Sequence, residues 1–277
     1  MSSVSLLGGE ETAGDTVLKV KEALSSILKS AKKYDLLAKN PVEGIIIPKQ
    51  KRVNRKKEKP VLPVEEFYLI LAEIQEPYAT MWHTAYFSGL RPSELIGLKI
   101  EDVQRDSITV REAYCRGDWK ETKTPLSAAT ISVPRAVYER IKRLRDLDIE
   151  YRSGGQGAKR CVKGMRSLER GSLVFQSLKK GGPMNDGNIL RRHIRPAAVK
   201  LGIDPKKVTW QALRRSYGTW LNASGANVKD VQAQMRHAKP DTTYGVYVQR
   251  VPESQKRAVD RMMQVMERQR KQGGKML

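Results

Sequence analysis

The hydrophobic positions of this chain repeat with the spacing of a helix along most of its length. The first such stripe begins after Asp15, which is placed to cap a helix, and the pair Asn40-Pro41 would stop that helix. Residues 1–14 are small, polar and aperiodic, so we expect a disordered lead-in there. We interpret residues 15–47 as a small helical unit, because a lone amphipathic helix needs a surface to pack against.

A second region of helical periodicity opens at Pro63, which suits the first turn of a helix. The next helix covers about 78–88, and Gly89 follows it as a C-terminal cap. Pro92 suits the first position of another helix, which places Arg91 at or beside the N-cap. A helix N-terminus favours anions, and an arginine there adds a two-pronged donor, so this position is a candidate phosphate contact.

The hydrophobic period changes to two between residues 106 and 133. Alternating positions at 108–110 and 130–133 flank a turn signal at Gly117-Asp118. We expect a small antiparallel sheet of about three strands here. Together with the surrounding helices, this sheet predicts an α+β fold that is mostly helical.

Helical periodicity returns after the predicted sheet. Pro134 begins a helix that extends to about Leu147, and Asp186 caps a later helix that Pro196 would bend. Between these helices, residues 152–170 are rich in glycine and in basic side chains. We interpret that segment as a mobile loop that reaches toward a polyanion.

The stretch 209–247 combines helical periodicity with groups that handle phosphate. Gln211 and Arg214 are three residues apart and project from one face of a helix. A second short helix delivers His237, and Tyr247 follows ten residues later, after a Pro-Asp-Thr helix-start signal. Arginine, histidine and tyrosine suit attack on a phosphodiester, as a fixed charge for the oxyanions, a hydrogen-bonding imidazole and a nucleophilic phenol.

The formal net charge of +22 is far larger than solubility requires. It favours a polyanionic partner, with nucleic acid first and a generic ribosome- or RNA-associated role as the alternative. Residues 48–60 are rich in lysine and arginine between two prolines, which is typical of a linker. Such a linker is either a solvated tether or one that tracks a phosphate backbone, and we favour the second. Its candidate DNA-binding residues are Lys51, Arg52, Arg55, Lys56 and Lys57.

Composition excludes several other classes. The two cysteines, Cys115 and Cys161, support neither a disulfide framework nor a cysteine-based zinc site. The three histidines lack metal-ligand spacing, and His83 and His193 are interpreted as packed or surface side chains. No apolar run has the length of a membrane span and no secretion leader is visible, so we expect a soluble, cytoplasmic, nucleoid-associated protein.

Three short motifs resemble those of the tyrosine recombinase (phage integrase) family. Residues 89–95, Gly-Leu-Arg-Pro-Ser-Glu-Leu, match the family's Gly-Leu-Arg-x-x-Glu-Leu. Residues 211–214, Gln-Ala-Leu-Arg, resemble His-x-x-Arg, and residues 235–237, Met-Arg-His, followed by Tyr247, resemble Leu-Gly-His and the nucleophilic tyrosine. Each motif alone is weak, but their order, spacing and turn context together are specific.

The resemblance implies a fold, a domain arrangement and a reaction. Residues 61–277 would form the catalytic domain with its C-terminal helix, and residues 15–47 would be the remnant of a helical core-binding domain. The reaction is site-specific cleavage and rejoining of DNA strands through a 3′-phosphotyrosyl intermediate. Because the covalent link conserves the phosphodiester energy, the resemblance implies no cofactor, neither ATP nor a metal. The implied partners are double-stranded DNA and further copies of the chain, a tetramer joined through the C-terminal helix.

The resemblance also assigns roles to single residues. Tyr247 would attack the scissile phosphate, while Arg91 and Arg214 hold its non-bridging oxygens. Lys123 would protonate the departing 5′-oxygen, and His237 would hydrogen-bond the phosphate or the nucleophile. Two assignments have nearby competitors on the chain, Lys120 for the lysine and Tyr244 for the tyrosine. Spacing from the histidine favours Tyr247 over Tyr244.

Two further side chains complete this set. Glu94 resembles the family's carboxylate that orients the site without taking part in the chemistry, and Arg215 is a candidate DNA contact.

The sequence departs from the family pattern at two places. Gln211 stands where the family usually has histidine; it keeps a donor and an acceptor but does not ionise near neutral pH. This predicts either a slow enzyme or a catalytically weakened integrase-like protein that still binds DNA. The second departure is Met-Arg before His237 in place of Leu-Gly, and we expect it to have no effect.

Overall fold

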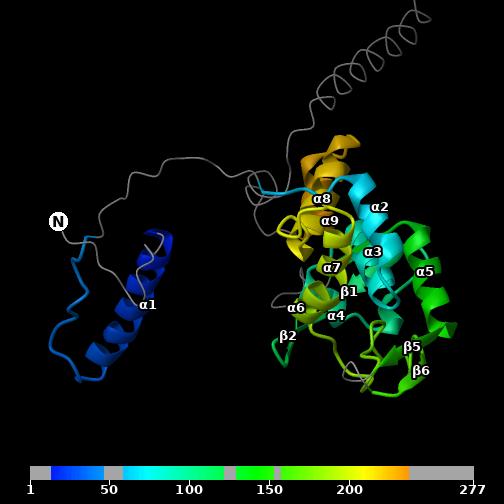
Figure 1. Ribbon diagram of the computed structural model, residues 1–277. Coiled ribbons are helices and arrows are strands. Elements are labelled where there is room, and N and C mark those ends of the chain that lie inside the picture. Colours follow the sequence, from blue (N-terminus) through cyan, green and yellow to red (C-terminus); the bar gives the residue numbers. More distant parts are fainter. Residues whose placement is uncertain (1–13, 47–58, 122–128, 153–156, 237–277) are drawn as a thin grey trace, which may run out of the picture. The chain divides into compact units, whose positions relative to one another are not determined.

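The computed structural model describes residues 14–46, 59–121, 129–152 and 157–236 (Figure 1). The chain divides into two compact units, residues 1–58 and 59–277, which we describe separately. The roles that we assigned to residues 1–14, 15–47, 48–60 and 61–277 stay predictions.

The first unit contains one helix, α1 (Gly14–Lys33), within its described residues. The helix ends earlier than the predicted stop at Asn40. Asp35 adopts a left-handed φ of 54°, and the Leu36 amide donates to the Ala31 carbonyl at 3.0 Å, which closes the helix end. Asparagine and aspartate tolerate this conformation better than most residues, so the local signal at Asp35 ends the helix before the proline.

The apolar stripe of α1 is present as predicted but lies in solvent. Leu24 is 44% exposed and Ile27 is 65% exposed. The segment after the helix folds back along it, where Asn40 donates to Ser25 and Val42 is buried. Within the described part of this unit, packing against α1 is therefore slight.

The second unit is mostly helical, and its helices surround one hydrophobic core (Figure 1). The α-helices among its described residues are α2 (Val64–Glu73), α3 (Tyr78–Ser88), α4 (Pro92–Ile96), α5 (Arg135–Asp146), α6 (Asp186–Ile189), α7 (Arg195–Lys200), α8 (Trp210–Ala223) and α9 (Val228–Met235). A 3₁₀ turn, η1 (Ile100–Asp102), follows α4. The helix starts predicted at Pro63, Pro92 and Pro134 are confirmed.

Helix α3 is the centre of this core. Nearly every side chain along it is buried, polar ones included, so it has no amphipathic stripe of the kind a surface helix shows. It packs against α8, α5 and α2. Trp82 on α3 meets Trp210 at the start of α8 with ring centroids 5.7 Å apart, and Tyr86 stacks on Phe67 of α2 at 3.9 Å. Its C-terminus, where Gly89 follows, is thereby held rigidly.

The strands form two-stranded antiparallel ladders. β1 (Ser107–Val110) pairs with β4 (Ala129–Ser132), and β2 (Glu112–Cys115) pairs with β3 (Asp118–Glu121). The α+β class is confirmed, but the described strands do not join into the single three-stranded sheet that we expected. Arg116 and Gly117 both have positive φ, which closes β2 and β3 into a tight hairpin of their own.

Within the segment 152–170, which we expected to be a mobile loop, Arg152 and the range Lys159–Lys163 belong to strands. β5 (Asp148–Arg152) pairs with β6 (Lys159–Lys163) over five residue pairs. The pair Ile149 and Val162 faces the core, whereas the other positions of β6 are exposed. Because most of the strand faces solvent, its sequence lacks the alternation by which a strand is predicted.

The regular α-helix is interrupted directly before Pro196, where we predicted a bend. A π-helical turn, η3 (Leu190–Ile194), joins α6 to α7, and the proline occupies the first turn of α7. His193 in this turn stacks on Tyr78 at 3.8 Å. His83 is buried in the core, and burial, with a smaller contribution from Arg140, lowers its pKa to about 4. Both histidines are packed side chains, as expected.

Candidate active site

The first motif places Arg91 at a helix start by local rules. Gly89 ends α3 in a left-handed conformation with φ 62°, and Pro92 opens α4 with Arg91 as its N-cap. Glu94 accepts two hydrogen bonds from the same residue, one from the Arg91 backbone N–H at 2.7 Å and one from Nη1 at 2.8 Å. The acid at this position thus caps the helix and contacts the arginine side chain; its predicted role in orienting the site stays a prediction.

Only glycine fits at the end of α3. A Cβ atom on Gly89 would lie 2.4 Å from Cδ1 of Tyr217, far inside van der Waals contact. The positive φ disfavours other residues for a second, independent reason. This close approach brings the α3 terminus against α8, and the Gly89 carbonyl oxygen accepts a hydrogen bond from Arg214.

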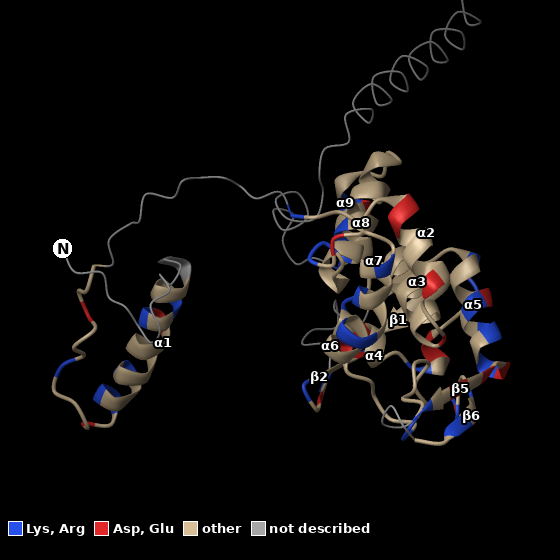
Figure 2. Cartoon of the chain, in the orientation of Figure 1, with Lys and Arg blue, Asp and Glu red and all other residues tan. Residues whose placement is uncertain are grey.

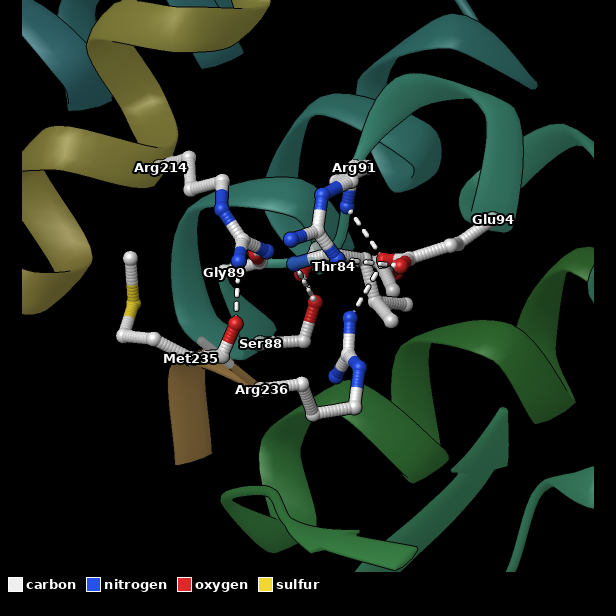
Figure 3. A network of polar contacts seen from close by, with 9 residues as sticks. Thr84, Ser88, Gly89, Arg91, Glu94, Arg214, Met235 and Arg236 are labelled. Carbon is white, nitrogen blue, oxygen red and sulfur yellow. Dashed lines mark hydrogen bonds and ion pairs between the residues drawn. The ribbon is translucent and has the colours of Figure 1, made fainter. Parts of the chain in front are cut away.

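Arg214 lies in the interior, 1% exposed, at the meeting point of three helices. Its Nη1 donates to the Gly89 carbonyl after α3, and its Nη2 donates to the Met235 carbonyl at the end of α9 (Figure 3). The last carbonyls of a helix have no partner within it and carry partial negative charge. The guanidinium satisfies one such group directly and joins both segments to α8.

Arg236 is a third arginine in the same cluster. It follows α9 in a left-handed conformation, φ 50°, and its side chain is 5% exposed. Its Nη2 donates to Oε2 of Glu94, so this carboxylate lies between the guanidinium groups of Arg91 and Arg236. Figure 3 shows the guanidinium groups of Arg91, Arg214 and Arg236 pointing toward one another from three helices.

The cluster carries three positive charges and one negative charge. Burial alone raises the pKa of Glu94, but Arg236, Arg91 and Arg214 together hold it below its usual value, so the carboxylate is ionised. Burial lowers the pKa of Arg236, and Glu94 opposes that effect. The side chain of Arg91 is 42% exposed and is the accessible member of this set. A surplus of fixed positive charge with one accessible guanidinium group suits binding of a phosphate group.

The second motif opens α8. The Thr209 side chain accepts from the Ala212 N–H at 3.0 Å and caps the helix. Gln211 lies in the first turn and is exposed, whereas Arg214, one turn later, is buried. The structure therefore brings Arg91, Glu94 and Arg214 together and leaves Gln211 at the surface of the same helix.

Arg215, which we expected to contact DNA, is buried against the backbone of its own chain. It is 8% exposed, and its Nε donates to the Pro60 carbonyl at 2.9 Å. The neighbouring Ser216 hydroxyl accepts from the Leu62 N–H at 2.9 Å. These contacts attach the segment before α2 to α8. DNA binding by Arg215 stays a prediction, and its observed contacts are internal.

Several predicted residues lie outside the described part of the chain. They are Lys51, Arg52, Arg55, Lys56, Lys57, Lys123, His237, Tyr244, Tyr247 and the C-terminal helix, and their roles stay predictions. Lys120, the competitor of Lys123, is described on β3, opposite Ala113.

Sequence reasoning missed Arg236. We expected the Met-Arg departure to have no effect, yet the structure places this arginine on Glu94. A signal was available, because a charged residue stands at a helix end where the resembling family has glycine, directly before His237. What the pattern did not indicate was the direction of the side chain.

The residues that the structure describes contain neither a candidate metal site nor a candidate membrane-spanning helix. No group of three histidine, cysteine or acidic side chains there could hold a metal ion. No helix in that part is long and apolar enough to cross a membrane.

The fold is that of tyrosine recombinase catalytic domains. The solved Tn1549 transposon integrase, in complex with a circular intermediate DNA, is similar with a TM-score of 0.59 at 20% identity, over 91% of this chain and 80% of that one. A lambda integrase dimer bound to a core site has a TM-score of 0.57 at 15% identity, over 87% of this chain and 75% of that one. These likenesses confirm the predicted mostly helical α+β class.

The model of the phage integrase family matches residues 60–253, and the chain belongs to that family. Tyrosine recombinase XerC of Psychromonas ingrahamii is 27% identical over 228 residues, which is 80% of this chain and 65% of the relative. Prophage integrase IntR of Escherichia coli K12 is 25% identical over 231 residues, 81% of this chain and 54% of the relative. The chain thus spans about two thirds or less of the length of these relatives.

Proposed function

We propose that this chain cleaves and rejoins DNA strands as a tyrosine site-specific recombinase. The observation that carries the proposal is the cluster in which Arg91 and Arg214, from helices far apart in the chain, meet around Glu94 and the end of α9. It occurs in a member of the phage integrase family, with the other motifs in the expected order.

The cluster suits the charge changes of phosphoryl transfer. Fixed arginines stabilise the non-bridging oxygens as negative charge redistributes, and loss of one such donor typically costs about 10²–10³ in rate. The Tyr247 oxygen forms a bond to phosphorus, and the bond from phosphorus to the 5′-oxygen breaks. Lys123 gives its proton to that oxygen, while the phenol proton passes to water or to His237. The product is a 3′-phosphotyrosyl link and a free 5′-hydroxyl.

Double-stranded DNA is the substrate and partner in this proposal. The net charge of +22 supports a polyanionic binding partner. Lysine and arginine side chains also lie along α5 and near the β5–β6 hairpin of the second unit (Figure 2). Two of the similar solved structures are DNA complexes by their own descriptions. Assembly of further copies through the C-terminal helix, as a tetramer on DNA, belongs to the same proposal.

Trapping the covalent intermediate tests this function. A nicked suicide duplex loses its 5′-hydroxyl fragment on cleavage, so the protein stays attached to the DNA. We expect an adduct from the wild-type chain, and we expect Tyr247→Phe to abolish it because the nucleophilic oxygen is removed. Tyr244→Phe is the matched control and should still form the adduct. Mass spectrometry of the digested adduct should place the nucleotide on Tyr247.

The opposite result from the two phenylalanine variants would reassign the nucleophile to Tyr244. No adduct from the wild-type chain, with binding to duplex DNA retained, would favour the second candidate function, a catalytically weakened DNA-binding member of the family. Gln211 is the observation behind that candidate, because an amide cannot act as a general base near neutral pH.

A further inference from the structure

Arg236 occupies an unfavourable backbone conformation for its residue type. Its φ of 50° and ψ of 52° are left-handed, a region that glycine adopts freely and that a long side chain adopts at a cost. Such positions persist where other contacts over-determine them, and they concentrate at functional sites. The contact here is the ion pair with Glu94, a residue 142 positions earlier in the chain.

The Arg236 side chain is also buried more deeply than its charge alone would allow. It is 5% exposed, and its Nη1 has no acceptor within the described part of the chain, although Nη2 is bonded to Glu94. Burying a charged group is costly unless it is paired. Pairing with Glu94 through Nη2 lowers that cost.

Both carboxylate oxygens of Glu94 accept hydrogen bonds. Oε1 accepts from Nη1 of Arg91, whereas Oε2 accepts from the Arg91 backbone and from Arg236. The carboxylate is itself 9% exposed, so it would lose its charge readily without cationic neighbours. A neutral carboxyl would hold the half-exposed Arg91 guanidinium much less firmly.

We propose that Arg236 is a positioning residue of the phosphate site, which acts through Glu94 to fix the guanidinium of Arg91 and to join the end of α9 to the start of α4. The inference rests on the proposed strand-cleavage function. The inference also gives a structural reason for arginine at a position where the family has glycine. The contact with Glu94 fixes the residue directly before His237.

The charges that face Glu94 come from three elements. Arg91 lies at the N-cap of α4, Arg214 on α8 and Arg236 after α9, and all three act to lower the pKa of the carboxyl against the effect of burial. Removing Arg236 must therefore raise the pKa of Glu94. Cleavage that needs the ionised carboxylate is lost as the pH falls through that pKa, so its acidic limit should move to higher pH.

The test is single-turnover adduct formation on the nicked suicide duplex across a range of acidic to neutral pH. Arg236→Gly suits the left-handed backbone, so any loss cannot come from strain. We expect this variant to cleave at least about tenfold more slowly, by analogy with the loss seen when a residue that orients a metal-ligating side chain is removed. We also expect its acidic limit to shift to higher pH. Arg236→Lys keeps the charge, and should retain the wild-type acidic limit with partly recovered rate.

Two controls separate positioning from other causes. Lys229→Ala removes one positive charge from the exposed side of α9, and should leave the rate and the acidic limit unchanged. Glu94→Gln removes the titrating group, and should abolish the acidic limit that the wild type shows. Thermal unfolding of each variant shows whether the fold is kept. If Arg236→Gly fails to fold, Arg236→Asn takes its place, because asparagine tolerates the left-handed backbone and also removes the charge; the same slower rate and higher acidic limit are expected.

The two proposals fail in different ways. Wild-type adduct formation together with an unchanged rate and acidic limit in Arg236→Gly would overturn the positioning role alone. A slower rate with an unmoved acidic limit would do the same, because a role through Glu94 requires the limit to move. Absence of any adduct from the wild-type chain would overturn the proposed function, and this inference with it.

Discussion

Two arginines of one cluster have opposite surroundings. Arg214 is 1% exposed and bonds to main-chain carbonyls at the ends of α3 and α9. Arg91 has a side chain that is 42% exposed, and its partner Glu94 is only three residues away. The first arginine connects parts of the chain that are distant in sequence, and the second is held by its own helix.

This difference in exposure predicts that the two arginines contribute differently to stability and to catalysis. A buried guanidinium that satisfies backbone carbonyls contributes to the fold whether or not a phosphate is bound. An exposed guanidinium contributes little to the fold but is accessible to a ligand. We therefore expect variants at Arg214 to lose stability and activity together, and variants at Arg91 to lose activity alone.

The largest effect on stability is expected from Arg214→Met. It removes the donors to Gly89 and Met235 and leaves buried carbonyls unsatisfied, each worth about 1–3 kcal/mol, so the free energy of unfolding should fall by about 3 kcal/mol. Urea denaturation measures this. Arg195→Met is the matched control, since that arginine has one long contact of 3.5 Å to Val208, and it should lose much less. Equal losses would contradict the role given to Arg214.

A smaller loss is expected from Gly89→Ala. The new methyl group meets Tyr217 at 2.4 Å in a left-handed backbone, so strain and overlap add to about 2–3 kcal/mol. Gly117→Ala is the matched control, because that glycine also has positive φ but nothing lies within 4 Å of its added Cβ. Thermal or urea unfolding of both variants should show the greater loss at Gly89, and similar losses would mean that Tyr217 moves aside.

The smallest effect on stability is expected from Arg91→Ala. Its side chain is half-exposed and Glu94 keeps its contact with Arg236, so the free energy of unfolding should change by less than about 1 kcal/mol. The rate of adduct formation should nevertheless fall by about 10²–10³. Lys200→Ala, which removes an exposed basic side chain paired with Glu73 of α2, should leave the rate unchanged. A large loss of stability at Arg91 would remove the distinction between the two arginines.

Sequence by itself determined the local parts of the fold. The left-handed glycine after α3, the proline at the start of α4 and the acid three residues beyond Arg91 were all predictable from near neighbours. These features depend on interactions within a few residues, where cap and turn chemistry acts. The family resemblance rested on the same short segments.

Only the tertiary structure decided which groups share the site. Arg214 reaches a carbonyl 125 residues away, and Arg236 reaches a carboxylate 142 residues away. It also decided that Arg215 is internal and that the basic segment around β6 is a hairpin. The physical reason is common to these cases. A guanidinium is long and can lie in solvent or in the interior, and its direction depends on which distant carbonyls and carboxylates the fold brings within reach.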